Sequence, residues 1–306
     1  MVAFQKYFLA VFLWLAALAA SAQQTNQDFA AGLASYHQAD WDGAITNFTK
    51  AIENSYRSYE SYGNRAYAKA KKGDSAGAMA DCNAALQLKP DFSGAYYWRS
   101  RVELELTNYD AALRDFKIGI KLGPKDRPAD LAESLSFRCW GLAFKKYRAG
   151  DLDGAITNLN EALYIAPTYS FPYGLRGWLK VLQNHCDSAI ADEYFAIKYL
   201  PKDPSNYEAR AWARYERGDV SGAMEDCKKA LEIYAQIYAK KADKEWLDQV
   251  SLNMEGLQSF INGDFEKASQ QWTRRLKEDP HMPSLDKAYL QKWIEKAQAK
   301  LQEKKP

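Results

Sequence analysis

Small and apolar side chains recur along the chain in a pattern with a period of 34 residues, broken by two longer intervals. An alanine stands at the same place in seven units, and successive alanines are 34, 34, 43, 34, 34 and 45 residues apart. These are Ala44, Ala78, Ala112, Ala155, Ala189, Ala223 and Ala268. A second small residue follows seven positions later in six of the units. The chain is therefore an array of repeated units.

Residues that break helices divide each unit. Four units have glycine followed by aspartate, with the glycine five residues before the alanine, and five units have proline twelve residues after it. The glycines are Gly73, Gly150, Gly218 and Gly263, and the prolines are Pro90, Pro124, Pro167, Pro201 and Pro280. Such residues end one helix and precede the next. Each unit is predicted to form two helices of about 14 residues that cross closely at the alanine.

The period and the small residues resemble the tetratricopeptide repeat, a helix-turn-helix unit of the same length. The resemblance implies an all-α, right-handed α-solenoid of seven helix-turn-helix tetratricopeptide repeats within residues 23–282. The expected repeats span 25–58, 59–92, 93–126, 136–169, 170–203, 204–237 and 249–282. Two extra segments, Arg127 to Leu135 and Tyr238 to Asp248, are expected to lengthen helices. Residues 283–306 are predicted to form a capping helix and tail.

Residues 1–22 have the composition of a signal peptide. Lys6 precedes an apolar run from Phe8 to Ala20, and small residues flank a predicted cleavage site before Gln23. We therefore expect an exported protein that is not inserted in a membrane once the signal is removed. The absence of a C-terminal retention signal favours the periplasm of a Gram-negative bacterium over a eukaryotic lumen.

Composition and motifs narrow the possible functions. The formal net charge is +2 with acids and bases interspersed, which argues against nucleic acid as a partner. The cysteines fall at packing positions of the repeat, so all four are predicted to be buried hydrophobic residues; they are Cys82, Cys139, Cys186 and Cys227. Motifs of nucleophilic, nucleotide or metal chemistry are missing from the sequence. We expect no enzyme activity, catalytic residue, metal or cofactor.

Two polar positions of the repeat vary together. Four units have arginine in the first helix and aspartate sixteen residues later, whereas the other three units have asparagine or glutamine at the second position. Antiparallel helices would bring the two positions side by side, and a buried arginine needs a carboxylate to offset its desolvation. The predicted structural ion pairs are Arg65 with Asp81, Arg99 with Asp115, Arg176 with Asp192, and Arg210 with Asp226.

The first helices of stacked units line the concave face of a solenoid, which is the usual ligand surface. Aromatic residues recur at the positions predicted to face this groove. The predicted partner-binding residues are Tyr67, Tyr97, Arg101, Trp140, Phe144, Trp178, Trp212 and Tyr215. Alternatively, individual rings pack between successive helices, which is common in solenoids.

An aromatic groove with few charges suits two classes of ligand. A peptide would bury apolar anchors in it, and an envelope glycan would stack its sugar rings on Trp and Tyr. The resemblance implies the first, because tetratricopeptide proteins mainly bind protein segments; a scaffold or adaptor for a protein partner is therefore expected, with carbohydrate binding as the alternative. Some members grip a C-terminal carboxylate with lysines and asparagines. Of the corresponding positions here only Asn64 conforms, which argues against that clamp.

Overall fold

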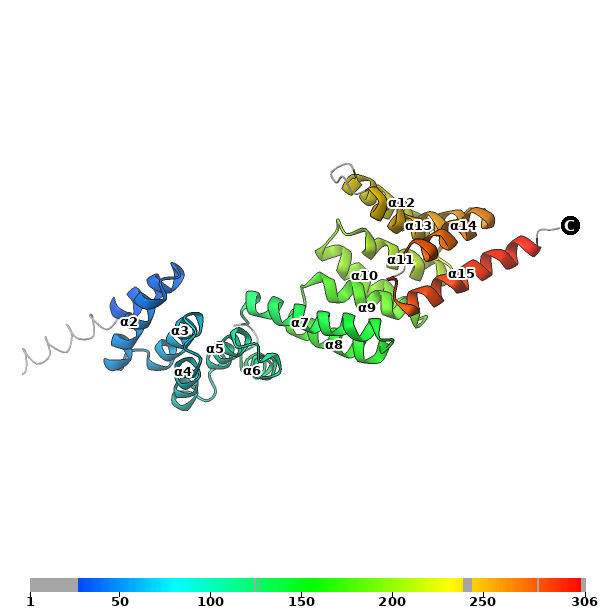
Figure 1. Ribbon diagram of the computed structural model, residues 1–306. Helices are drawn as coiled ribbons and strands as arrows, with labels where there is room; N and C mark the ends of the chain where they lie inside the picture. The colour runs from blue at the N-terminus through cyan, green and yellow to red at the C-terminus, as the bar shows by residue number, and fades with distance from the viewer. Residues whose placement is uncertain (1–26, 124, 126, 239–243, 280, 304–306) are drawn as a thin grey trace, which may run out of the picture. The chain divides into compact units, whose positions relative to one another are not determined.

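A computed structural model describes residues 27–123, 125, 127–238, 244–279 and 281–303 (Figure 1). The predicted signal peptide lies outside these residues, as do Pro124 and Pro280. Every regular element within them is a helix, and none of these helices has the length and apolar character that a membrane crossing needs.

Residues 27–37 are helical, and the later helices follow one another with short connections. They are α2 (Trp41–Glu53), α3 (Ser58–Lys71), α4 (Ser75–Leu88), α5 (Ser93–Glu105), α6 (Tyr109–Leu122), α7 (Ala129–Arg148), α8 (Leu152–Ile165), α9 (Ser170–Leu182), α10 (Cys186–Tyr199), α11 (Pro204–Glu216), α12 (Val220–Tyr238), α13 (Lys244–Ile261), α14 (Phe265–Glu278) and α15 (Ser284–Glu303). Successive helices pack as pairs, as in α3 with α4 or α11 with α12. The structure is the all-helical repeat fold that the sequence predicts.

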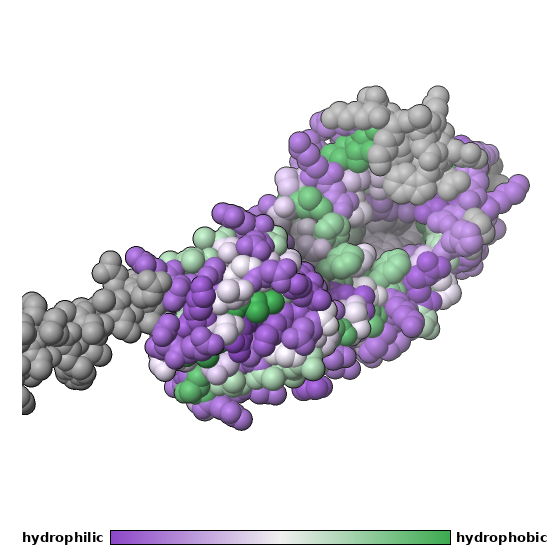
Figure 2. Space-filling model, turned by 60° about the vertical axis from the view of Figure 1, so that its left-hand side comes forward, coloured by the Kyte–Doolittle hydropathy of each residue, from purple (hydrophilic) through white to green (hydrophobic). Residues whose placement is uncertain are grey.

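The chain forms two compact units, Met1–Leu135 (unit 1) and Ser136–Pro306 (unit 2), and their boundary falls within α7. The helices next to the two extra segments, α7, α12 and α13, have 18 to 20 residues, whereas most of the others have 13 or 14. On the face shown in Figure 2, strongly hydrophobic residues form separate patches among hydrophilic ones, because each helix turns its apolar side inward.

The repeated alanines lie where the helices of each pair meet. All seven, from Ala44 to Ala268, are completely buried. A methyl group at this point lets two backbones approach closely, and a larger side chain would force them apart. The period of the sequence is therefore the period of the helix crossings.

The turn inside each pair has a left-handed residue at one fixed position. The four glycines five residues before the alanines have φ between 79° and 91°, and the equivalent Ala39, Thr107 and Asn184 have φ between 57° and 63°. In five units the next residue is an aspartate that accepts a hydrogen bond from the backbone N–H three residues later, as Asp151 does from Gly154. The aspartates of these turns are helix caps.

The four predicted arginine–aspartate pairs are all present. Arg65 donates from Nε and Nη2 to the two carboxylate oxygens of Asp81, at 2.8 and 2.7 Å, and the other pairs have the same two-bond geometry. Arg65 also donates from Nη1 to Thr49, in the second helix of the preceding unit. Arg99 and Arg176 make the same backward contact with Asn83 and Asn160. Each of these three arginines joins the second helices of two successive units.

The core of unit 2 is an aromatic cluster beneath α15. Trp212, Trp272 and Trp293 lie 5.0 to 5.9 Å apart between ring centroids, and each is at most 1% exposed. On α15 the buried residues are Leu290, Trp293, Ile294 and Ala297. The cysteines follow the prediction except for Cys186, which is half-buried because it begins α10 beside the turn; the other three are buried.

Candidate ligand-binding pocket

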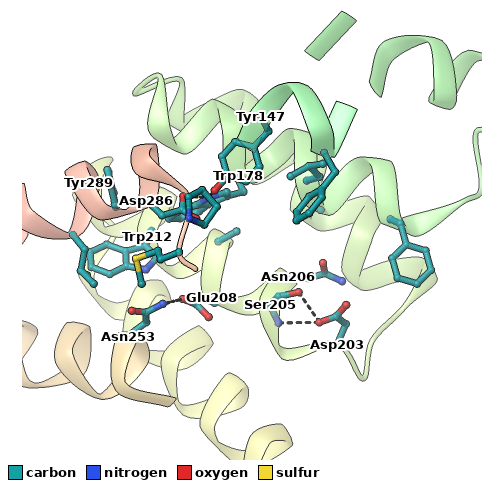
Figure 3. A pocket seen from close by; sticks show the side chains of 18 of the residues that line it. Tyr147, Trp178, Asp203, Ser205, Asn206, Glu208, Trp212, Asn253, Asp286 and Tyr289 are labelled. Carbon is teal, nitrogen blue, oxygen red and sulfur yellow. Dashed lines mark hydrogen bonds between the residues drawn. The ribbon is translucent and has the colours of Figure 1, made fainter. Parts of the chain in front are cut away.

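Unit 2 contains a cavity of about 470 Å³ (Figure 3). The helices α7, α9 and α11, each the first of a pair, supply one wall with Trp140, Trp178 and Glu208, among others. The opposite wall comes from α15 and the segment before it, including Asp286. The volume lies within the range of roughly 300–1,000 Å³ in which small-ligand sites fall. The cavity is therefore large enough to enclose a side chain or another small part of a ligand.

One edge of the cavity carries an exposed aromatic surface, the aromatic shelf, formed by Phe137, Trp140, Phe144 and Phe171. Trp140 stacks on Phe137 at 5.5 Å and on Phe144 at 5.8 Å between centroids, with interplanar angles of 23° and 18°. These three residues share a face of α7 because they are three and four positions apart. Phe137 and Phe144 are 52% and 37% exposed. The shelf therefore presents apolar ring surface to a ligand.

A hydrogen bond joins the two walls of the cavity. Trp178 on α9 donates from Nε1 to Asp286 Oδ1 on α15 at 2.9 Å, and its ring packs edge-on against Tyr289 at 5.5 Å. Burial raises the pKa of Asp286 above its ordinary value. The contact holds α15 across the first helices of the earlier pairs, so the C-terminal helix forms part of the cavity as well as a cap.

Glu208 is a carboxyl group of the cavity whose pKa lies above its ordinary value. Its Oε1 accepts from Asn253 Nδ2 at 2.8 Å and its Oε2 from the Tyr234 hydroxyl at 3.2 Å. Burial raises the pKa of Glu208 to about 7, despite these bonds and the charge of Arg275. A carboxyl group with this pKa is half-ionised at neutral pH, so nearby charges control its state.

Three buried polar atoms of the cavity residues have no hydrogen-bond partner within the described part of the chain. They are Oδ1 of Asn253, an acceptor, Nε of Arg275, a donor, and the hydroxyl of Tyr289, which can do either. Arg275 uses Nη1 for an ion pair with Asp279 at 2.7 Å. Buried polar groups are nearly always hydrogen-bonded in native proteins. A ligand with both a donor and an acceptor would supply partners for these atoms.

The predicted binding residues of unit 2 fall into two groups. Trp140, Phe144 and Trp178 line the cavity with partly accessible rings. Trp212 also borders it, but it is only 1% exposed, because α15 places Trp293 on it; the expectation of an open ring there is wrong. Tyr215 lies against Trp293 at 5.4 Å and does not border the cavity.

The predicted binding residues of unit 1 belong to other surroundings. Tyr97 is buried, and the prediction that it lines a groove is wrong: its ring occupies the space opposite Gly119, and its hydroxyl donates to the Gly123 carbonyl at 3.2 Å. Tyr67 lies half-buried under the guanidinium of Arg101, which is 5.3 Å from the ring centroid.

Arg101 also has a carboxylate partner. It forms a two-bond ion pair with Asp130, from Nη1 at 2.6 Å and from Nη2 at 3.0 Å, which lowers the pKa of that carboxyl. Its charge is therefore already neutralised within unit 1, rather than available to a ligand in a groove.

Several cavity residues were not among the predicted binding residues, namely Asp203, Glu208, Asn253, Arg275, Asp286 and Tyr289. The repeat register indicates three of them. Glu208 and Asn253 stand at the groove-facing register of Tyr97 and Trp140, and Arg275 replaces a small residue. Arg275 stands seven residues after Ala268, where the other six units have Ala or Gly. No such signal exists for Asp286, because it lies on α15, outside the repeats.

Comparisons with known proteins agree with the repeat fold. A tetratricopeptide-repeat family profile matches residues 29–93. DnaJ homolog subfamily C member 3 of Gallus gallus is 25% identical over 257 residues, which cover 78% of this chain and 49% of the relative. Serine/threonine-protein phosphatase T of Aspergillus oryzae is 31% identical over 165 residues, 52% of this chain and 33% of the relative. The chain thus spans half or less of the length of these relatives.

A solved structure shows the same fold. The C-terminal part of a tetratricopeptide-repeat protein from Cytophaga hutchinsonii superposes with a TM-score of 0.50 and 16% identity. The superposition covers 84% of this chain and 97% of the other. At this identity the likeness concerns the arrangement of helices.

Proposed function

The chain belongs to the tetratricopeptide-repeat family, and from this premise we propose that it is an adaptor that binds a segment of a partner protein at the cavity of unit 2. The observation that supports the proposal is the aromatic shelf beside a cavity with unsatisfied polar atoms. Exposed ring faces bury apolar side chains of a segment, and such anchors dominate binding energy. The cavity then receives one side chain of that segment.

The family supports binding over catalysis. Tetratricopeptide repeats are typically non-catalytic interaction scaffolds. The similarity to the phosphatase covers one third of that protein, so it gives no reason to assign phosphatase activity to this chain.

An envelope glycan is the second candidate, and one observation favours it. The partly exposed ring of Trp140 stacks between Phe137 and Phe144, so aromatic surface lies beside hydrogen-bonding groups. A sugar ring could lie on such a surface with its hydroxyls directed at Asn253 and Arg275. Protein segments remain the leading proposal because of the family.

A site in the cell envelope is part of the proposal. It rests on the predicted signal peptide, residues 1–22. Mass spectrometry of the protein recovered from its own cells tests this, since export with cleavage would leave Gln23 as the first residue. Recovery with residues 1–22 attached, in the cytoplasmic fraction, would exclude it.

A degenerate peptide library presented to the purified protein tests the binding proposal. Wild type should capture a subset of peptides that the double variant Trp140→Ala/Phe144→Ala loses. Tyr194→Ala is the matched control, because Tyr194 is 57% exposed on α10 and does not border the cavity. Circular dichroism checks that all three proteins keep their helices. Equal capture by all three would move the site away from the shelf. Capture of envelope oligosaccharides but not peptides would support the glycan.

A further inference from the structure

We infer that the cavity is built to receive a positively charged side chain, lysine or arginine, from the bound segment. This inference rests on the proposed function and specifies the chemistry of its ligand. Three features of the cavity support it: the charges of its wall, the buried acceptor Asn253 Oδ1, and the aromatic rings around them.

The first argument is the balance of charged groups. Four carboxyl groups and one guanidinium border the cavity: Asp203, Glu208, Asp279, Asp286 and Arg275. Arg275 is already paired with Asp279 at 2.7 Å. The hydrogen bonds to Glu208 come from Asn253 and Tyr234 and the one to Asp286 from Trp178, and all three donors are neutral. A buried carboxylate without a cation is costly, and an incoming cation offsets that cost.

The second argument is the unpaired acceptor. The Nδ2 group of Asn253 donates a hydrogen bond to Glu208. The Oδ1 atom of the same amide is buried and has no donor. An ammonium group has three donors and a guanidinium has five. Either could donate to Asn253 Oδ1 and to Glu208 together. A neutral apolar side chain would leave Asn253 Oδ1 without a donor and the charge of Glu208 without a cation.

The third argument is the aromatic wall. Trp140, Trp178 and Tyr289 border the cavity with the carboxyl groups. Ring faces attract cations through their quadrupole, and they pack well against the aliphatic stem of lysine or arginine. The rings therefore suit the aliphatic stem of such a side chain, and the carboxyl groups without a cationic partner suit its charged end. The opposite polarity, a ligand carboxylate, would meet four acidic groups here.

Three labelled peptide pools provide the test. Each pool is an acetylated seven-residue peptide with a fixed central residue, flanked by random positions from which Asp, Glu, Lys and Arg are omitted. The central residue is lysine, arginine or norleucine, and binding is measured by fluorescence polarisation. We expect the lysine or the arginine pool to bind wild type at least tenfold more tightly than the norleucine pool.

Isosteric variants assign the effect to the cavity. Glu208→Gln and Asp286→Asn keep the shape of the wall and remove a charge, so each should reduce the tenfold preference to about twofold or less. Glu295→Gln is the matched control: Glu295 lies exposed on α15 and does not border the cavity, and its loss should leave the preference unchanged. An equal loss in Glu295→Gln would show a general charge effect and overturn the inference.

Binding as a function of pH tests the same point without a substitution. Glu208 is faced by Tyr234 of α12, Arg275 of α14 and Asp286 of α15. Burial raises its pKa to about 7, and a bound cation favours the ionised form. The lysine pool should therefore bind several-fold more tightly at pH 8 than at pH 6, while the norleucine pool changes little.

The outcomes separate the two proposals. If the norleucine pool binds as tightly as the charged pools, and Trp140→Ala/Phe144→Ala abolishes both, the segment-binding function stands and the cationic anchor is wrong. If no pool binds wild type, both are wrong. A lysine affinity that does not change between pH 6 and pH 8 also counts against the inference.

Discussion

Trp178 Nε1 and Asp286 Oδ1 lie 2.9 Å apart and join two helices whose bonded residues are 108 positions apart in the sequence. The bond fastens α15 over α9. It therefore fixes the position of the wall that closes the cavity, and it ties the C-terminal helix to the first helix of an earlier pair.

Trp178→Phe tests this fastening. Phenylalanine keeps a ring but removes the donor to Asp286 and to the Tyr147 hydroxyl. We expect the free energy of unfolding in urea to fall by about 1–3 kcal/mol. Trp140→Phe is the control, because the Trp140 indole makes no hydrogen bond within the described part of the chain, and a smaller change should result. Equal losses in the two variants would show that ring size matters and the bond does not.

The ion pairs predict a non-additive pair of substitutions. Asp115→Asn leaves Arg99 partly buried without its carboxylate, and we expect a loss of about 2–4 kcal/mol in the free energy of unfolding. The double variant Arg99→Leu/Asp115→Asn reproduces Leu142 and Asn158 of unit four, so it should recover most of that loss. Chemical denaturation of both singles and the double gives the coupling energy. Strict additivity would refute a direct pair.

Features within one repeat could be predicted from the sequence, because the helix-turn-helix unit fixes which positions meet. The buried alanines and the arginine–aspartate pairs, sixteen residues apart, are of this kind. Trp178 and Trp212 show the limit. They occupy the same register in adjacent units, yet only Trp178 is partly accessible, since Trp293 of α15 lies on Trp212. The repeat pattern does not predict which helices α15 packs against.

Tyr97 and Trp140 give a second example of the same limit. Both stand at one register of the first helix, but Tyr97 turns inward because Gly119 on the facing helix leaves room for its ring. In unit four the facing residue is Ala162, and Trp140 lies on the cavity edge instead. Gly119 thus leaves room for the Tyr97 ring in the core, but the facing residue alone does not decide burial, since Phe29 at the same register is buried opposite Ala51.

Thr107 is predicted to be a strained turn residue. Its φ is 63°, a left-handed value that is rare for a β-branched side chain, whereas four other units have glycine at this position. Thr107→Gly should raise the free energy of unfolding by about 1 kcal/mol. The reverse change, Gly73→Ala at φ 84° with nothing near the added methyl, should lower it by about the same amount. Thermal melts compare both, and a loss on Thr107→Gly would contradict the strain.

Glu193 occupies a repeat position that otherwise holds an apolar or cysteine side chain. The equivalent residues are Phe48, Cys82, Phe116, Leu159, Cys227 and Trp272. Glu193 is completely buried, and neither carboxyl oxygen has a hydrogen-bond partner in the described structure. Gly177 provides the space for it, since a methyl group there would lie 2.2 Å from Oε1. Burial raises the pKa of Glu193 well above 4.5, with the neighbouring Asp192 adding to the effect.

This pKa predicts how stability depends on pH. The folded state keeps the carboxyl group protonated, whereas the unfolded state ionises it above about pH 4.5, so unfolding releases a proton. The stabilising effect is complete below pH 4.5 and is lost as the pH rises towards the folded-state pKa. Glu193→Gln removes this dependence: its stability advantage over wild type should grow between pH 5 and pH 7 by up to about 1.4 kcal/mol per pH unit. Urea denaturation at each pH measures it, with Glu295→Gln as an exposed control that should follow wild type. A constant difference between Glu193→Gln and wild type would mean that Glu193 is ionised in the folded protein.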